Sequence, residues 1–461
     1  MIAQVRCLVT GATGYIGTRL VPRLLDEGYR VRALARNPAK LADVPWREQA
    51  EVAQGDLSDV DSLIAAFEGI DVVYYLVHSM GTSKNFAAEE TRTARNVVAA
   101  ARRTGVRRVV YLSGLHPDAG KLSPHLASRV AVGEALVDSG IEAVVLQAGV
   151  VVGSGSASFE MIRHLTDRLP VMTTPKWVHN RIQPIAVHDV LHYLVAAATA
   201  AVPSSRTWDI GGPDVLEYGD MMRVYAEVAR LGRRYLVVLP FLTPTIASLW
   251  VGTVTPIPPG LARPLIESLE CHAVMRNFDI DSIIEPPPGG LTGYRRAVEL
   301  ALRRATRGLP DATWSSLRSE PAEPLPSDPP WAGAVVYTTV RTAATIAEPE
   351  DVWKTAEKAV NDSRWYSLPV GQGRRRSNGW SVAEREPGSR LRLRARMRSP
   401  GRAWLEITVT PQEGGGSRYT QRSIFFPRGI LGRVYWFTVR PLHTAAMRAL
   451  ARDVVGSARE F

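Results

Sequence analysis

Over roughly the first 150 residues, short apolar runs alternate with longer segments in which apolar residues recur every three or four positions. The short runs predict buried parallel strands, which are nearly continuous in apolar residues. The longer segments predict helices with one apolar face, as Ile16, Leu20 and Leu24 show in the first of them. Strands that alternate with helices predict a doubly wound parallel α/β sheet. The predicted strands cover residues 5–9, 30–35, 51–54, 72–77, 108–112 and 143–147.

The alternation loosens after residue 150, where the pattern predicts a small α/β lid, mainly within residues 150–305. A short strand and turn at residues 208–212 belong to this predicted lid. Residues 236–257 are a long apolar stretch with several prolines and no charge. They predict a buried or interfacial hairpin of the lid. Because the stretch is long enough to cross a bilayer, peripheral membrane contact is the alternative.

A change of composition divides the chain. Residues 306–331 are rich in Pro, Ser and Glu, which is typical of a linker between domains. We therefore expect a first domain over residues 1–305 and a second over residues 332–461.

The second domain has a different pattern, which predicts an α+β fold. Residues 391–398 alternate apolar side chains with arginines, as in a half-exposed antiparallel strand, whose basic face is expected to be solvated. Residues 404–410 and 418–425 predict a hairpin around a glycine-rich turn. Residues 431–455 predict a helix that is interrupted at Pro441.

Composition limits the classes of function. The only cysteines among the 461 residues, Cys7 and Cys271, give neither a disulfide framework nor metal-ligand spacing, so we expect a cytoplasmic protein without a metal. No signal peptide is expected, because the first strand begins almost at once. The net charge of +11 is compatible with nucleic acid or an anionic membrane as partner. No nucleic-acid motif occurs, however, and no nucleic-acid partner is expected.

The turn after the first predicted strand carries the main candidate chemistry. Three glycines at intervals of three residues suit a sharp turn, a close approach of main-chain N–H groups to a pyrophosphate, and a helix packed closely on the sheet. The positive end of the helix then faces the phosphates. The strand before this turn and the helix and strand after it favour a dinucleotide site over a tight turn that binds nothing. The expected contacts are Gly11, Thr13, Gly14, Tyr15, Ile16 and Gly17.

The end of the second predicted strand indicates which dinucleotide binds. It carries Arg36 and no carboxylate, which favours the 2′-phosphate of NADP over the 2′-hydroxyl of NAD. Arg19 is a second candidate cation, and a solvated Arg36 is the alternative. Asp56, followed by Leu57, either contacts the adenine or caps the next helix. Because ligands bind beyond the carboxyl ends of parallel strands, one crevice is expected to hold these strand-end residues together: Gly11, Arg36, Asp56, His78 and Ser113.

With these motifs in view, residues 1–305 resemble the atypical branch of extended short-chain dehydrogenases/reductases, close to NmrA-like regulators and proteins like the 39-kDa subunit of respiratory complex I. The resemblance rests on the glycine turn, Arg36, Asp56 and the stretch Tyr74-Tyr75-Leu76-Val77-His78-Ser79-Met80. It implies a Rossmann fold, an NAD(P) cofactor and His78 as a cofactor contact. Residues from about 335 to 455 are similar to START-like (SRPBCC) helix-grip domains, which enclose an apolar cavity.

The chain departs from this family at the catalytic positions. Short-chain dehydrogenases use a Tyr-x-x-x-Lys pair together with a serine, which Ser113 matches. The corresponding helix positions hold His125 and Arg129. His125 is a candidate general acid, since histidine titrates near neutrality, and Arg129 is a candidate cation for the cofactor ribose. The alternative is that both only line the crevice. His78, His116 and Lys121 are further candidates, and for each of them a structural role is the favoured alternative.

Three functions follow from these expectations. The first is an NADP-dependent oxidoreductase that acts on a hydrophobic small molecule. The second is a non-catalytic NADP(H)-binding redox sensor or assembly factor. The third is a carrier of a lipid or another hydrophobic ligand, which binds through the second domain.

Overall fold

The computed structural model describes residues 5–77, 86–118, 120, 122–239, 243–303, 337–361, 380–396, 399–412, 415–427 and 429–458. The chain divides into two compact units, one formed mainly by the described residues up to 303 and the other mainly by those from 337 onward. The predicted linker at residues 306–331 lies outside the described residues.

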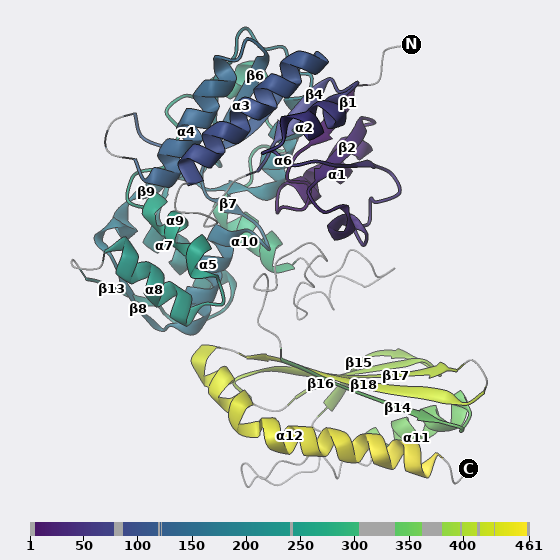
Figure 1. Cartoon of the computed structure of the whole chain (residues 1–461). Helices are drawn as coiled ribbons and strands as arrows, with labels where there is room; N and C mark the ends of the chain where they lie inside the picture. Colours follow the sequence, from purple (N-terminus) through teal and green to yellow (C-terminus); the bar gives the residue numbers. More distant parts are fainter. Residues whose placement is uncertain are drawn as a thin grey trace. The chain divides into compact units, whose positions relative to one another are not determined.

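A seven-stranded parallel sheet forms the centre of the first unit (Figure 1). Its order is β11-β6-β5-β4-β1-β2-β3, and all neighbouring strands run parallel, which confirms the predicted doubly wound sheet. The strands are β1 (Arg6–Val9), β2 (Arg30–Ala35), β3 (Glu51–Gln54), β4 (Val72–Tyr75), β5 (Arg108–Gly114), β6 (Glu142–Ala148) and β11 (Arg206–Ile210). The expectation that residues 208–212 belong to the lid is wrong, because β11 extends the main sheet beside β6.

Helices cover both faces of this sheet. On one face, α1 (Gly17–Asp26) and α6 (Val187–Ala196) pack into a core that includes Leu20 and Tyr193. On the other face, α2 (Val60–Phe67), α3 (Phe86–Thr104) and α4 (Pro124–Val137) pack into a core that includes Phe67, Val97 and Leu136. The recurrence of apolar residues every three or four positions supplies one buried face for each helix.

The lid consists of three two-stranded sheets with surrounding helices (Figure 1). The strand pairs are β7 (Val151–Val152) with β10 (Ile185–Ala186), β9 (Arg181–Ile182) with β12 (Leu216–Glu217), and β8 (Val171–Thr174) with β13 (Tyr235–Val238). Its helices are α5 (Ala157–Arg168), α7 (Tyr218–Val228), α8 (Pro244–Val254), α9 (Pro259–Ser268) and α10 (Tyr294–Arg303), with 3-10 turns at η2 (Lys176–His179) and η3 (Asp279–Ser282).

The hairpin expected over residues 236–257 is wrong. The described part of this stretch contains β13 and the helix α8. The side chain of Thr243 accepts a hydrogen bond from the N–H of Ile246, and Pro244 occupies the first turn, so the local sequence starts a helix here. Among the described residues, no helix is long and apolar enough to cross a membrane.

The second unit is an α+β fold, as predicted. Its antiparallel sheet has the order β14-β18-β17-β16-β15, and a buried cluster formed by the sheet and the helices includes Trp353, Leu405 and Leu450 (Figure 1). The elements are β14 (Tyr337–Thr345), α11 (Pro349–Asn361), β15 (Trp380–Glu386), β16 (Arg390–Ala395), β17 (Gly401–Pro411), β18 (Ser417–Pro427) and α12 (Gly429–Ser457).

Two sequence features of this unit can be compared with the structure. The predicted alternation appears in β16, where Leu391 and Leu393 are buried and Arg392 forms ion pairs with Glu384 and Glu406. The interruption predicted at Pro441 is wrong, because α12 continues through it. Proline removes one backbone hydrogen bond from the helix, and the loss of this one bond does not end α12 here.

Arg276 joins the lid to the end of the main sheet. Its backbone N–H donates to the Asp209 carboxylate at 2.7 Å, and its guanidinium donates to Gln147 at 2.7 Å and to Asp118 at 2.6 Å. Asp209 is fully buried, and the guanidinium lies 3.4 Å from its carboxylate. A buried carboxylate is costly unless it is hydrogen-bonded and paired, so this contact fixes the segment after α9 on the sheet.

We expect Arg276→Ala to destabilise the first unit by about 3 kcal/mol, because the buried carboxylate of Asp209 loses its paired cation. Thermal unfolding followed by circular dichroism measures the effect. Arg295→Ala is the matched control, because the ion pair of Arg295 with Glu227 has both side chains more than half exposed and is expected to contribute less than about 1 kcal/mol. Equal melting temperatures for the two variants would contradict the structural role assigned to Arg276.

Candidate functional site

A cavity of about 810 Å³ lies at the carboxyl ends of the parallel strands. This is the position at which doubly wound sheets bind their ligands. The further candidates Arg19 and His116 do not line this cavity, whereas twelve of the predicted site residues do: Gly11, Thr13, Gly14, Tyr15, Ile16, Gly17, Arg36, Asp56, Leu57, Ser113, His125 and Arg129. The structure thus brings together residues that are spread over more than a hundred positions of the sequence. His78 and Lys121 lie outside the described residues.

The glycine turn has the backbone geometry that its sequence predicts. Gly11 has a φ of +66°, in the left-handed region that favours glycine. A Cβ on Gly17 would lie 2.2 Å from the carbonyl oxygen of Gly11, so only glycine fits there. The Gly14 N–H donates to the same carbonyl at 2.8 Å and closes the turn.

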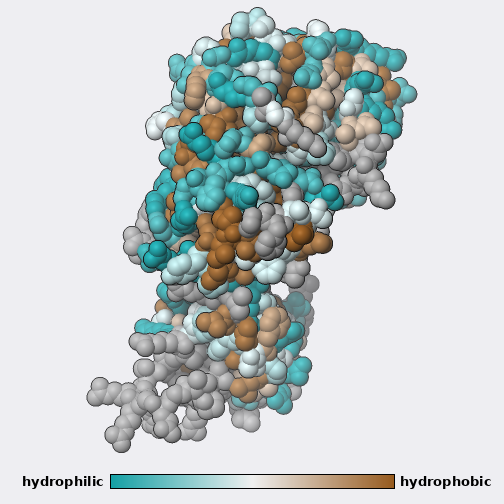
Figure 2. Space-filling model, turned by 90° about the vertical axis from the view of Figure 1, so that its left-hand side faces the viewer, coloured by the Kyte–Doolittle hydropathy of each residue, from teal (hydrophilic) through white to brown (hydrophobic). Residues whose placement is uncertain are grey.

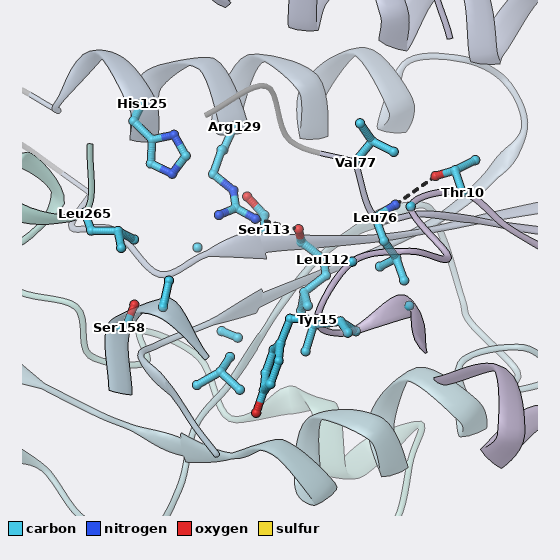
Figure 3. A pocket seen from close by; sticks show the side chains of 18 of the residues that line it. Thr10, Tyr15, Leu76, Val77, Leu112, Ser113, His125, Arg129, Ser158 and Leu265 are labelled. Carbon is cyan, nitrogen blue, oxygen red and sulfur yellow. Dashed lines mark hydrogen bonds between the residues drawn. The ribbon is translucent and has the colours of Figure 1, made fainter. Parts of the chain in front are cut away.

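This turn fits a dinucleotide. Gly14 to Gly17 line the cavity, and no side chain caps the N-terminus of α1. The N-terminus of a helix binds phosphate well, since its backbone N–H groups can donate hydrogen bonds and the helix dipole favours an anion. Thr10 fixes the turn on the sheet, because its hydroxyl donates to the Tyr74 carbonyl and accepts from the Leu76 N–H, both at 3.0 Å (Figure 3).

Arg36 and Asp56 both line the cavity at the ends of β2 and β3, and the charge of Arg36 acts on Asp56. Ser58 donates to Asp56 through both its N–H and its hydroxyl at 2.8 Å, and these bonds, with a contribution from the Arg36 charge, hold the pKa of Asp56 below its ordinary value. The alternative that Asp56 caps α2 is wrong, because Asp59 accepts the capping hydrogen bonds. The exposed Arg36 side chain leaves room for an anion beside it.

Arg19 does not serve as a second cation beside Arg36. It is buried and is not among the residues that line the cavity. Its guanidinium stacks on the Tyr15 ring and donates to the carbonyls of Tyr15 and Ser154, each at 3.0 Å. Arg19 therefore connects the glycine turn to the lid.

The three candidate catalytic residues meet where α4 crosses the end of β5. Figure 3 shows His125 and Arg129 projecting from one helix, with Ser113 beside Arg129. Their spacing of four residues places His125 and Arg129 on the same face of α4. Arg129 donates to the Leu112 carbonyl at 3.0 Å, and the Ser113 hydroxyl is enclosed next to it. The catalytic roles of these residues stay predictions.

The protonation state of His125 limits its chemistry. Burial, with a smaller contribution from the Arg129 charge, lowers the pKa of His125 to about 3. The imidazole is therefore neutral at physiological pH. It can donate a hydrogen bond from one ring nitrogen, but it does not supply the extra proton of an imidazolium.

Buried polar side chains connect α4 to α3, and the sequence does not predict this contact. The Ser128 hydroxyl donates to the carboxylate of Glu90 on α3 at 2.5 Å, although Glu90 is almost fully buried. Burial raises the pKa of Tyr111, while Arg129 lowers it and Glu90 raises it further, so a cation and an anion both lie near this ring. The sequence of α3 carries two adjacent carboxylates, Glu89 and Glu90, and nothing in its pattern distinguishes the buried one.

His116 belongs to a structural network. Its Nδ1 lies 3.0 Å from the Pro117 carbonyl, which can only accept, so Nδ1 carries the proton. The Nε2 then accepts from the Gln147 amide at 3.1 Å. Both ring nitrogens are engaged away from the cavity lining, so the expectation of a further catalytic histidine here has no support.

The lid supplies an apolar wall that the sequence did not reveal. Figure 3 shows Leu265 and Ser158 on the same side of the cavity as His125, away from Leu76 and Val77 beside the glycine turn. One cavity therefore has a polar end for a dinucleotide and a largely apolar end next to His125. The lid residues of the apolar wall are Val150, Ile182, Leu265, Leu269, Cys271 and Ala273, and Leu115, directly after β5, adds to it.

Comparison with known proteins agrees with this geometry. Residues 11–153 match the family described as NAD(P)H-binding, and residues 353–450 match a family described as a protein of unknown function. The first unit is therefore a Rossmann-like unit with an NAD(P)H-binding domain. The match supports its resemblance to NmrA-like short-chain dehydrogenases. The START-like identity of the second unit is not shown.

Individual relatives cover the chain unevenly. Over 119 residues the chain is 39% identical to 3 beta-hydroxysteroid dehydrogenase/Delta 5-->4-isomerase of Mycobacterium tuberculosis. This match covers 23% of this chain and 31% of that protein. It is 24% identical over 278 residues to NADH dehydrogenase [ubiquinone] 1 alpha subcomplex subunit 9, mitochondrial, of Arabidopsis thaliana, covering 58% of this chain and 69% of that protein.

Among solved structures, an NADPH-dependent quinone oxidoreductase of Escherichia coli, solved in complex with NADPH, has a similar fold. The TM-score is 0.51 at 19% identity, over 63% of this chain and 98% of that one.

We expect Gly17→Ala to weaken NADPH binding at least about tenfold, because the new methyl group would displace the Gly11 carbonyl and distort the phosphate-binding turn. Isothermal titration calorimetry measures the affinity. Gly232→Ala is the control, since a Cβ there meets nothing within 4 Å. Unchanged binding by Gly17→Ala would show that the dinucleotide does not lie on this turn.

Proposed function

We propose that this protein is an NADPH-dependent oxidoreductase that reduces a hydrophobic, quinone-like acceptor. The observation that carries the proposal is the single cavity that joins the glycine turn to His125 and to the apolar wall of the lid. A cofactor held on the turn and an apolar acceptor beside His125 would share one enclosed space, as hydride transfer requires.

The preference for NADPH rests on Arg36. NADPH, when bound, supplies a hydride, and its 2′-phosphate distinguishes it from NADH. Arg36 is an exposed cation that lines the cavity directly after β2. The guanidinium of an arginine is complementary to a phosphate in charge and shape, whereas NAD sites of this fold have a carboxylate at the same position.

The class of acceptor follows from which side chains of the site can donate a proton. A ketone that takes up a hydride becomes a strongly basic alkoxide and needs an acid beside it. Arg129 remains charged and His125 is neutral, so neither provides that proton readily near pH 7. A quinone becomes a stabilised hydroquinone anion, which takes its proton from water. The neutral His125 is suited to donate one hydrogen bond to the oxygen that gains charge.

A second candidate function is an NADP(H)-binding protein without turnover. The low pKa of His125 and the bond between Arg129 and the Leu112 carbonyl favour it, because both suggest a structural role for the two residues. The same cavity then binds the cofactor without an acceptor.

A carrier function remains a proposal for the second unit alone. Its antiparallel sheet and long helix α12 resemble the arrangement of a START-like domain, which would bind a hydrophobic ligand. Mass spectrometry of ligands that co-purify with the full chain tests it.

We expect the protein to oxidise NADPH with a short-chain benzoquinone and not with an aliphatic ketone of similar size. The rate is expected to stay level from about pH 8 to 5, because His125, with a pKa of about 3, does not titrate there. His125→Leu should lower kcat/KM up to about tenfold through loss of one hydrogen bond. His125→Asn keeps a donor and is the control. Tight NADPH binding without reduction of any quinone would contradict the oxidoreductase and favour the second candidate.

We expect Arg36→Ser to weaken NADPH binding by about 10- to 100-fold, because a charge-assisted hydrogen bond to the 2′-phosphate is lost, while NADH binding stays nearly constant. Calorimetry with both cofactors separates the two effects. Lys40→Ala removes one positive charge from the neighbouring 3-10 turn η1 (Pro38–Leu41) and serves as the control for a general loss of charge. Equal losses for NADPH and NADH in Arg36→Ser would contradict 2′-phosphate recognition.

A further inference from the structure

Large apolar side chains gather on the outside of the lid, over β8, β13 and α8. Leu249 is 63% exposed, Tyr235 is 54% exposed and Trp250 is 41% exposed. Figure 2 shows hydrophobic residues gathered at the level where Figure 1 places these elements. A cluster of this kind is unusual on a protein surface and marks an interaction site. We define the lid apolar surface by its members: Val171, Tyr235, Val237, Val238, Ile246, Leu249 and Trp250.

Helix α8 explains why this surface is apolar. Its buried face carries Ala247 and Val251, and α8 packs against α9. The opposite face carries Ile246, Leu249 and Trp250, at the spacing of one helical stripe. Because the helix is apolar on both faces, the face that is turned away from α9 leaves large apolar side chains exposed among the described residues.

The segments that form the lid apolar surface carry no acidic residue. Residues 228–266 contain no Asp or Glu, and neither do residues 168–188. Arg230 and Arg233 are exposed just before β13, and the Arg233 guanidinium lies 5.4 Å from the centre of the Tyr235 ring. An apolar surface that includes Trp250 and Tyr235 and has arginines next to it in the chain has the composition of a membrane-interface site.

We propose that the lid apolar surface docks on an anionic lipid bilayer. The apolar side chains enter the headgroup region, and the arginines contact lipid phosphates. Helix α8 lies in the interface, since no described helix is suited to span the membrane. A second copy of the chain fits less well, because a two-fold contact would bring the same arginines together.

This surface lies next to the wall of the cavity. Helix α9, on which α8 packs, contributes Leu265 and Leu269 to the cavity. If the protein is an oxidoreductase as proposed above, docking would place the apolar end of the cavity near acceptors dissolved in the bilayer. The docking itself does not depend on turnover, so it is tested without cofactor or acceptor.

The test is flotation of the full chain with phosphatidylglycerol–phosphatidylcholine vesicles. We expect the protein to float with these vesicles and to bind pure phosphatidylcholine more weakly, with binding to the anionic vesicles falling as salt is added. The double variant Leu249→Glu with Trp250→Glu should bind at least about tenfold more weakly. Arg233→Glu should lose the preference for anionic lipid.

Phe278→Glu is the matched control, because Phe278 is 67% exposed and lies outside the lid apolar surface. This variant is expected to bind vesicles like the unchanged protein. The substituted positions are exposed, and NADPH affinity checks that each variant is folded. Absence of vesicle binding by the unchanged protein would overturn the proposal, as would equal binding by the double variant. A dimer in light scattering that the double variant dissociates, without vesicle binding, would assign the surface to a second copy.

Discussion

The contact between Gly17 and the Gly11 carbonyl constrains the whole cofactor end of the first unit. With only hydrogen at Cα, the start of α1 approaches the end of β1 closely enough for the Gly14 N–H to close the turn. Thr10 then attaches this turn to the end of β4, and Arg19 attaches it to the lid. A single steric requirement therefore determines where a phosphate would lie and also where the apolar wall stands relative to it.

The chemistry of the cavity depends on the ionisable side chains that are buried around it. Arg129 brings a permanent cation to the position where the related dehydrogenases have lysine, and it lies beside a histidine that burial already keeps neutral. The carboxyl group of Glu90 is buried on the neighbouring helix and accepts a hydrogen bond from Ser128, which precedes Arg129. This arrangement keeps α4 in place beside α3. It differs in kind from a tyrosine whose pKa is lowered by a lysine.

Local patterns explain which parts of the structure could be predicted. The parallel strands and the glycine turn depend on residues that are adjacent in the sequence, and both are confirmed. The sequence does not reveal that β11 belongs to the main sheet, because its partner β6 lies about 60 residues away and the pairing leaves no local signal. In residues 236–257 the prolines predict a turn, whereas Thr243 and Pro244 begin a helix. Pro441 predicts a break, but α12 continues through it. The apolar wall and Glu90 depend on contacts between distant elements, so no pattern in the sequence reveals them.

The position of Arg276 has a consequence for synthesis of the chain on the ribosome. The edge strand β11 and its carboxylate, Asp209, emerge well before the arginine that neutralises them. Until residue 276 has left the exit tunnel, burying Asp209 at the sheet end costs several kcal/mol, because its charge would stand alone. The nascent chain should therefore complete its first six strands early and add the seventh late, when translation of the lid is nearly finished.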